Sequence, residues 1–334
     1  MQSVHDLRGL AALAVLLHHV AASAYVAPPR AIARVAELGY HGVTAFFVIS
    51  GFVLPYSLYR SSYRLEDFGG FITRRFARVE PPYFVTIAAV LLLNLLVATI
   101  KHTPFRIDGA QVALHAAYLV PLFGKSWLLS VFWTLCVEFQ FYVLIGLCYP
   151  LLLRRPVLSA MGCAAAMCFA TPGWFPVDQV ALGQRENLLL HLPVFMVGIL
   201  LFLQRERLIA PHAFWVSLAL SLVVIAVKSP AATLGATIVA SLIIVFVRRS
   251  HPVLAFFGDI SYSLYLVHLL VILTILPLLS RMSLGWFTMA AIAVAASIGA
   301  AMGLWLAVER PAIVWSKRLP QRARTVSAAQ GAPA

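Results

Sequence analysis

Charged residues are scarce in this sequence. Asp, Glu, Lys and Arg make up only 11% of the 334 residues, whereas a soluble domain carries about a quarter. Hydrophobic residues make up 62%. Apolar runs of about 20 residues recur from end to end, each long enough to cross the hydrocarbon core of a bilayer as a helix. This composition excludes an ordinary soluble globular protein and predicts an all-α fold, a polytopic membrane helical bundle.

Cysteine and acidic residues are also few. The four cysteines all fall inside apolar runs and show no metal-type pairing, so we predict neither disulfides nor a metal site. The 12 Asp and Glu residues are outnumbered by 25 Lys and Arg residues, which gives a formal net charge of +13. Such a surplus suits either a nucleic-acid-binding protein or a membrane protein, and the positions of the basic residues decide between them.

The apolar runs predict ten membrane spans. These spans distribute the basic residues unequally between the two sides of the membrane. With the N-terminus inside, about two thirds of the basic residues fall on the cytoplasmic side, which is the bias that orients membrane helices. The basic surplus therefore requires no nucleic-acid partner, and we expect both termini to be cytoplasmic. The predicted spans are residues 7–26, 37–58, 81–100, 130–152, 156–172, 187–203, 213–228, 231–247, 258–279 and 285–308.

The segments outside the spans are short. Residues 1–316 are predicted to form one integral membrane domain, and residues 317–334 a disordered cytoplasmic tail. Residues 59–80 are predicted to form a basic cytoplasmic loop. The segment 101–129 contains an apolar stretch too short to span, so we expect it at the outer interface. No internal repeat is obvious, which disfavours an inverted-repeat transporter.

The first span has an alternative interpretation as a secretory signal peptide. The letters AASA at residues 21–24 resemble a cleavage site. Asp6 stands where such a peptide should be basic, and His18 and His19 interrupt the approach to cleavage. We favour a span that is not removed.

Three ionisable residues lie within the apolar run LRGLAALAVLLHH of the first span: Arg8, His18 and His19. Arg8 and His19 are eleven positions apart. Eleven residues of helix correspond to about three turns and about 16 Å, so both side chains share one face. Arg8 lies at the cytoplasmic edge, where it could be a topological anchor. His19 lies deeper, where ionisable groups usually face a bundle interior or a wet cavity. We predict a functional role for His19 and a packing role for His18.

Three arginines, Arg74, Arg75 and Arg78, precede the third span in the letters FITRRFARVEPPY. They could anchor the topology of the chain. They could also capture an anion, because guanidinium groups grip phosphate bidentately. The prolines at 81 and 82 would then stiffen the entry into the next helix.

Further polar side chains fall inside predicted spans. Glu138 lies well inside the fourth span, where a carboxylate must be paired, protonated or functional. Ser261, Tyr265 and His268 fall on one face of the ninth span. Together with His19, these residues predict a polar cavity inside the bundle.

Two other segments have structural interpretations. Ser50 and Gly51, with Gly42, are small residues that permit close helix approach in the second span, and Ser50 is also a candidate substrate contact. The letters ERP at residues 309–311 are predicted to form a cap and anchor at the end of the tenth span.

Taken in order, these segments resemble acyltransferase family 3, the membrane-bound acyltransferases that modify bacterial surface polysaccharides and related acceptors. The first run resembles the family's Arg-(ten residues)-His motif, and GVTAFFVISGF resembles its second-helix signature. The letters RRFARVEPPY, WTLCVEFQFY, SYSLYLVH and ERP follow in the family's order. The resemblance implies a multi-pass protein of the bacterial inner (plasma) membrane. It implies transfer of an acyl group from cytoplasmic acyl-CoA, above all acetyl-CoA, to a hydroxyl of a carbohydrate or glycolipid acceptor.

The resemblance also assigns roles to residues of this chain. It implies that Arg8 and His19 are the essential pair and that Arg74, Arg75 and Arg78 lie near the CoA phosphates. We expect His19 to act as general base on the acceptor hydroxyl, since imidazole titrates near the working pH.

The remaining candidates are assigned to supporting roles. Glu138, or a polar partner such as Tyr265, is expected to orient His19. Ser50, Ser261, Tyr265 and His268 are expected to contact substrate, and the outer surface to contact membrane lipid.

Two rival classes are open to test. In a transporter, His19, Glu138 and His268 would form a proton relay. In a non-catalytic scaffold, these polar residues would only pack, and a conservative change such as Arg8→Lys would be tolerated. For an acyltransferase, the acceptor could be a macrolide, a sugar repeat unit or a lipid-linked glycan.

Overall fold

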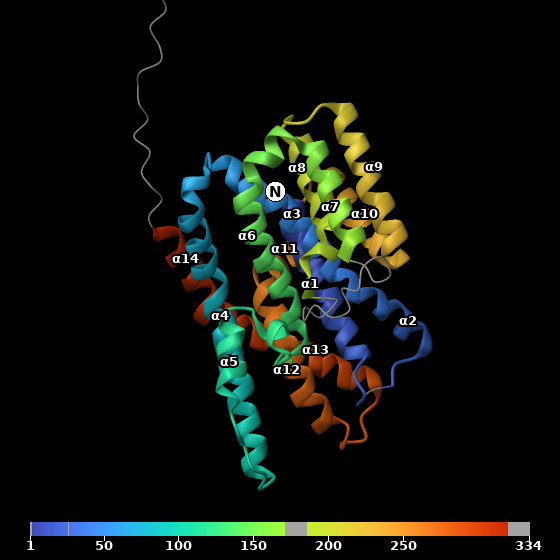
Figure 1. Ribbon diagram of the computed structural model, residues 1–334. Coiled ribbons are helices and arrows are strands. Elements are labelled where there is room, and N and C mark those ends of the chain that lie inside the picture. Colours follow the sequence, from blue (N-terminus) through green and yellow to red (C-terminus); the bar gives the residue numbers. More distant parts are fainter. Residues whose placement is uncertain (1, 26, 171–185, 320–334) are drawn as a thin grey trace, which may run out of the picture.

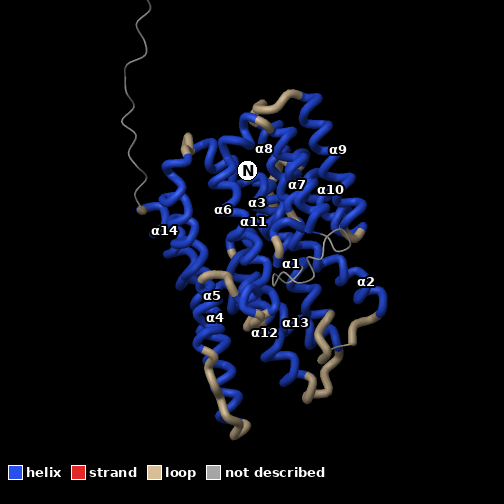
Figure 2. The backbone as a smooth tube through the Cα atoms, viewed as in Figure 1, coloured by secondary structure: helices blue, strands red, loops and turns tan. Residues whose placement is uncertain are grey.

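The structure is a computed structural model that describes residues 2–25, 27–170 and 186–319. Within these ranges the chain consists of helices and loops without strands (Figure 2), which confirms the all-α prediction. The α-helices are α1 (Gln2–Ala21), α2 (Arg30–Leu38), α3 (Gly42–Arg60), α4 (Phe68–Ile100), α5 (Gly109–Ala116), α6 (Trp133–Arg154), α7 (Pro156–Ala170), α8 (Leu192–Arg205), α9 (Pro211–Lys228), α10 (Ala231–Phe246), α11 (Pro252–Asp259), α12 (Ser261–Leu279), α13 (Trp286–Leu304) and α14 (Arg310–Arg318). A π-helical turn, Trp305–Glu309, joins α13 to α14.

Each of the ten predicted spans overlaps a helix in the described residues, but the bounds and lengths of the helices differ from those of the spans. In the described part of the chain, six helical stretches are long and apolar enough to cross a membrane. These stretches are Arg30–Arg60, Leu65–Ile100, Ser130–Arg154, Pro211–Lys228, Ser261–Leu279 and Trp286–Arg318. Helices α7, α8 and α10 are apolar but shorter, and α1 is not among the six. The number ten and the side of the membrane on which the termini lie stay predictions.

Helix α8 shows why a short apolar helix is tolerated here. It has 14 residues, about 21 Å of helix, whereas a hydrocarbon core is about 30 Å thick. All of its residues from Leu192 to Leu203 are buried. The helix lies inside the protein, between α3, α7 and α9, so its length need not match the bilayer.

Close packing of α3 against α8 depends on two glycines. A Cβ on Gly51 would collide with the carbonyl oxygen of Phe195, and a Cβ on Gly198 would collide with that of Val48. The predicted close approach at Gly51 is therefore confirmed, and its partner is Gly198. Helix α1 lies centrally and packs against α3, α11 and α12 (Figure 1).

Helix α4 begins earlier than predicted, at Phe68. The predicted loop over 59–80 is therefore wrong beyond residue 67, and Arg74, Arg75 and Arg78 lie within a helix. Apolar residues spaced by three and four continue the buried face toward the N-terminus, with Phe71 buried. The two prolines lie inside α4 rather than at its entrance, which membrane helices tolerate when neighbours satisfy the freed backbone groups.

The ends of the described chain lie in the upper half of Figure 1, where α14 packs against α4. The predicted tail begins inside α14, because Lys317 and Arg318 are helical; residues 320–334 lie outside the described residues.

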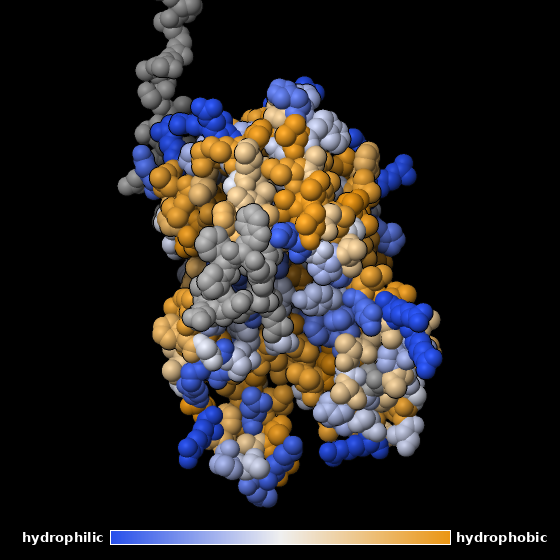
Figure 3. All heavy atoms as spheres, turned by 45° about the vertical axis from the view of Figure 1, so that its right-hand side comes forward, coloured by the Kyte–Doolittle hydropathy of each residue, from blue (hydrophilic) through white to orange (hydrophobic). Residues whose placement is uncertain are grey.

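Figure 3 shows a broad apolar surface over the upper half of the α9 side, with hydrophilic side chains at the top edge and around the lower end. This distribution suits a protein whose flank faces lipid.

Candidate active site

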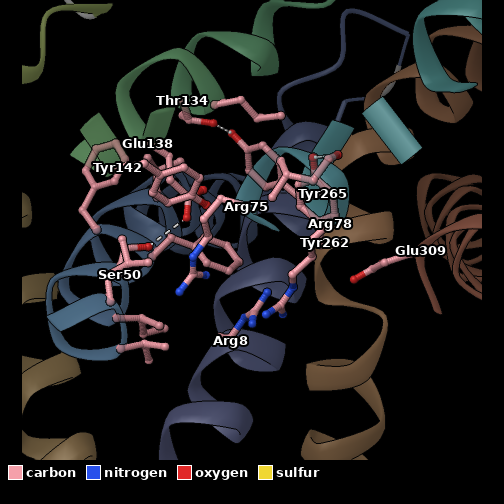
Figure 4. Close-up of a pocket in the computed structure, with 18 residues that line it drawn as sticks. Arg8, Ser50, Arg75, Arg78, Thr134, Glu138, Tyr142, Tyr262, Tyr265 and Glu309 are labelled. Carbon is pink, nitrogen blue, oxygen red and sulfur yellow. Dashed lines mark hydrogen bonds between the residues drawn. The ribbon is translucent and has the colours of Figure 1, made fainter. Parts of the chain in front are cut away.

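A polar cavity of about 110 Å³ lies within the bundle. Helices α1, α3, α4, α6 and α12 and the π-helical turn contribute its walls (Figure 4). Its ionisable and hydroxyl-bearing lining residues are Arg8, Ser50, Arg75, Arg78, Thr134, Glu138, Tyr142, Tyr262, Tyr265 and Glu309. A volume of this size holds several water molecules. Of the residues on which the predicted polar cavity rested, Glu138 and Tyr265 line this cavity, whereas His19, Ser261 and His268 do not.

The guanidinium groups of Arg8, Arg75 and Arg78 gather on one side of the cavity (Figure 4). Arg75 is held between aromatic rings, with its Cζ 5.6 Å from the ring centres of both Phe71 and Tyr142. Such cation–π contacts fix the direction of the side chain. Helix α4 thus places Arg75 and Arg78 near Arg8 of α1.

Two carboxylates face the three arginines. Glu138 Oε1 accepts a hydrogen bond from Ser50 Oγ at 3.0 Å. Glu309 Oε2 accepts two, from Ser263 Oγ at 2.6 Å and from the Ser263 backbone N–H at 3.1 Å. Three positive and two negative groups leave one surplus positive charge in the lining, which favours an anionic ligand.

His19 pairs with another imidazole rather than with a carboxylate. His19 Nδ1 lies 2.9 Å from the Val15 carbonyl oxygen and 3.3 Å from His268 Nε2, and His268 Nδ1 lies 3.0 Å from the Leu264 carbonyl oxygen. A carbonyl oxygen only accepts, so each Nδ1 carries a proton. His268 Nε2 then accepts from His19, and the lone pair of His19 is on its Nε2.

Tyr265 joins this histidine pair to the cavity. Its hydroxyl lies 2.7 Å from Thr134 Oγ1 and donates to the Val131 carbonyl oxygen at 3.1 Å. Its ring lies 5.8 Å from the ring of His268, which in turn lies 5.0 Å from that of His19. The tyrosine therefore lines the cavity with one edge and contacts His268 with the other.

The predicted site residues divide into three groups. Arg8, Arg75, Arg78, Ser50, Glu138 and Tyr265 line the cavity, and His19 and His268 form the adjoining pair. Two do not line it. Arg74 is half-buried on α4 outside the cavity. Ser261 is fully buried and donates to the Gly258 carbonyl oxygen at 2.8 Å, where it holds the turn between α11 and α12.

Two expectations are corrected. Glu138, or a polar partner such as Tyr265, was expected to orient His19. Glu138 is hydrogen-bonded to Ser50 instead, and Tyr265 packs against His268, which is the residue in contact with His19. Residues 309–311 were expected to be a cap and anchor, but Glu309 is buried and lines the cavity. The signal for Glu309 was a carboxylate at the end of a long apolar run, where burial demands partners.

A second polar cluster, which the sequence did not reveal, lies beside the middle of α4. His115 Nδ1 lies 2.9 Å from the Tyr83 hydroxyl, and its Nε2 accepts from the Leu128 N–H at 3.3 Å. Burial lowers the pKa of His115 to about 4, so the imidazole is neutral near pH 7. Tyr118 donates to Glu80 Oε1 at 2.7 Å nearby. This cluster ties α5 and the following loop to α4. It adjoins the arginine cavity, because Glu80 and Tyr118 line a small gap together with Arg75 and Glu138.

The chain is similar to known proteins. The chain matches the acyltransferase domain family over residues 3–306. It is 33% identical to acyltransferase MdmB of Streptomyces mycarofaciens over 186 residues, which are 51% of this chain and 44% of that protein. It is 25% identical to nodulation protein 10 of Rhizobium leguminosarum bv. viciae over 328 residues, which are 86% of this chain and 85% of that protein. No solved structure matches the chain.

The family match runs from before Arg8 to the π-helical turn, so it includes the histidine pair and nearly all of the cavity lining. The match to MdmB covers less than half of that protein. Because the family match covers nearly the whole chain, this protein belongs to acyltransferase family 3 and is a membrane-bound O-acyltransferase.

Proposed function

We propose that the protein transfers an acyl group, in the first instance acetyl, from cytoplasmic acyl-CoA to a hydroxyl of a carbohydrate or lipid-linked glycan, in the bacterial inner membrane. The observation that carries this proposal is the pair of contacts at Nδ1 of His19, from which its tautomer follows. Its Nδ1 proton is shared between the Val15 carbonyl and His268 Nε2, so its Nε2 is the nitrogen able to accept a proton.

His19 Nε2 is the general base of the proposed reaction. It takes the proton of the acceptor hydroxyl as that oxygen attacks the thioester carbonyl carbon. The carbon–oxygen bond forms, the carbon–sulfur bond breaks, and the proton passes from His19 to the departing sulfur. His268 stabilises the transient imidazolium of His19, because its Nε2 accepts a hydrogen bond from the Nδ1–H of His19.

The arginine cavity suits one anionic group of the donor. Its volume of about 110 Å³ is below the range of about 300–1,000 Å³ that holds drug-sized ligands. It therefore has room for a phosphate or for the small acyl end, and the rest of the donor would lie outside. Arg75 and Arg78 present guanidinium groups that can bind phosphate bidentately. Arg8 adds a third guanidinium group from α1.

The test is acyl transfer by purified protein. Wild type, His19→Ala and the matched control His212→Ala, which changes an exposed histidine at the start of α9, would be given radiolabelled acetyl-CoA and a mixed pool of envelope glycans. We expect label on a glycan with wild type and His212→Ala but not with His19→Ala. Turnover by His19→Ala at the wild-type rate would show that His19 is not the general base. If acetyl-CoA labels no acceptor in the pool, the proposal that acetyl-CoA is the acyl donor is wrong.

A further inference from the structure

A second, larger cavity lies apart from the arginine cavity, between α8, α9 and α10 and beside the start of α1. It has a volume of about 880 Å³, within the range of about 300–1,000 Å³ that is typical of ligand sites. The three helices stand together at the upper right of Figure 1. Phe52 of α3 forms part of its inner wall, and Ser50 of the same helix faces the arginine cavity. The two cavities are thus on opposite sides of α3.

The outer walls of this groove are apolar and face the surroundings. Trp215 and Leu222 line it on α9, and Leu242 and Phe246 line it on α10. Trp215 is 64% exposed, Leu242 50% and Phe246 71%. In a membrane protein, apolar side chains exposed to this extent on the bundle flank contact lipid. The groove therefore opens toward the membrane rather than toward water.

The groove is nearly as deep as one leaflet. Its lining on α9 runs from Phe214 to Leu222 and on α10 from Ile238 to Phe246, about 12 Å of helix each, and Val247 and Arg248 extend it beyond the end of α10. Half of a bilayer's hydrocarbon core is about 15 Å. An acyl chain that entered at one interface would end near the middle of the membrane, where the groove ends.

Charge at the mouth of the groove selects the kind of headgroup. Arg205 and Arg248 line the same end, at the C-termini of α8 and α10. Arg205 lies over the ring of Phe52, with Cζ 5.9 Å from the ring centre, and its Nε is 3.9 Å from Glu206 Oε1. One acidic residue against two arginines leaves the mouth basic. Guanidinium groups at headgroup level attract anionic lipids of the leaflet that they face.

We propose that this groove binds one anionic phospholipid, with its phosphate between Arg205 and Arg248 and an acyl chain along α9 and α10. The site is independent of acyl transfer and would be occupied in the resting protein. Since Phe52 forms its inner wall, the bound lipid supports the face of α3 that lies behind the acyltransfer cavity.

Native mass spectrometry of the full-length, delipidated protein with dioleoyl phosphatidylglycerol tests the proposal. Leu242→Trp fills the groove from α10, and Val239→Trp, also exposed on α10 but outside the groove, is its matched control. Arg205→Gln with Arg248→Gln removes the basic mouth; Arg154→Gln with Arg155→Gln removes the same charge elsewhere. We expect at least tenfold weaker lipid binding in the two groove variants and wild-type binding in the two controls.

Three results would overturn the proposal. Leu242→Trp could bind phosphatidylglycerol as well as Val239→Trp does, which would place the lipid elsewhere. Dioleoyl phosphatidylcholine could bind as tightly as phosphatidylglycerol, which would remove the role of the arginines. A long-chain acyl-CoA could displace the lipid at equal concentration, which would make the groove a donor site. Unfolding temperatures of the four variants within a few degrees of wild type keep these outcomes interpretable.

Discussion

His268 Nε2 lies 3.3 Å from His19 Nδ1, although 249 positions separate the two residues in the sequence. The contact joins the first helix of the bundle to α12. It fixes which nitrogen of His19 carries the proton and which carries the lone pair. The orientation of the proposed base thus depends on the packing of α1 against α12 and not on a nearby carboxylate.

Removal of His268 should slow catalysis without loss of donor binding. We expect His268→Ala to lower kcat by about 100-fold, in the range for a misoriented general base, with little change in KM for acetyl-CoA. His268→Gln should restore part of the rate, because its amide oxygen can accept the Nδ1 proton of His19. Steady-state kinetics over a range of pH would show the change. An unchanged kcat in both variants would contradict the positioning role.

Adjacent arginines on α4 should differ in their effect on the donor. Arg75 lines the cavity between two rings, whereas Arg74 lies outside it. We expect Arg75→Lys to raise KM for acetyl-CoA about tenfold, since an ammonium group lacks the planar fork that stacks and binds bidentately. Arg74→Lys should leave KM within about twofold. Equal effects of the two substitutions would mean that the cavity does not hold the donor.

The carboxylate of Glu309 should depend on Ser263 for its stability in the bundle. Ser263→Ala leaves a buried carboxylate short of one hydrogen bond, which costs about 2 kcal/mol. The control is Ser297→Ala on α13, which is equally buried. Its hydroxyl donates only to the carbonyl of Ala293, so its removal is nearly neutral. Thermal unfolding in detergent should show a lower midpoint for Ser263→Ala alone.

Alanine in place of the paired glycines should separate α3 from α8. In Gly51→Ala and Gly198→Ala the new Cβ meets a backbone carbonyl that cannot move aside, so each should lose about 3 kcal/mol or more of stability. Gly162→Ala and Gly299→Ala, where no atom lies within 4 Å of the new Cβ, should be neutral or slightly stabilising. Size-exclusion profiles and unfolding midpoints would distinguish the two pairs.

Acid should loosen the cluster around His115. Burial lowers the pKa of His115 from 6.5 to about 4, so the unfolded segment binds a proton that the folded one excludes. The contribution to stability is complete above pH 6.5 and is lost as the pH falls toward 4. The protection of Gly109–Ala116 against hydrogen exchange, measured relative to the intrinsic exchange rate at each pH, should therefore fall between pH 6.5 and 4.5 in wild type. In His115→Gln the exchange should lose this pH dependence once the intrinsic rate is corrected for.

Helix positions could be predicted from the sequence because each depends on a local sum of hydropathy. The runs around Gly51 and Glu138 contained helices where they were expected. The start of α4 could not be predicted in this way. Its first turns are basic and resemble a loop in composition, but they form a helix because Phe71 and Ala77 are buried against neighbours.

The site was predicted in part. Arg8 and His19 were found because ionisable groups in an apolar run are costly, which makes them conspicuous in one segment. Glu309 was missed as a cavity residue because its place at a helix end gave it an ordinary explanation. Which polar groups meet depends on how distant helices pack, and hydropathy carries no information on that.

By itself the sequence determined the class of the protein, the approximate location of its apolar helices and the ordered motifs of acyltransferase family 3. These follow from composition and from spacing along one helix. The tertiary structure alone decided that His19 is paired with His268, that Glu138 bonds Ser50, and that Glu309 joins the arginines. The physical reason is that a buried polar group must find its partner across a helix interface, and the partner is chosen by packing in three dimensions.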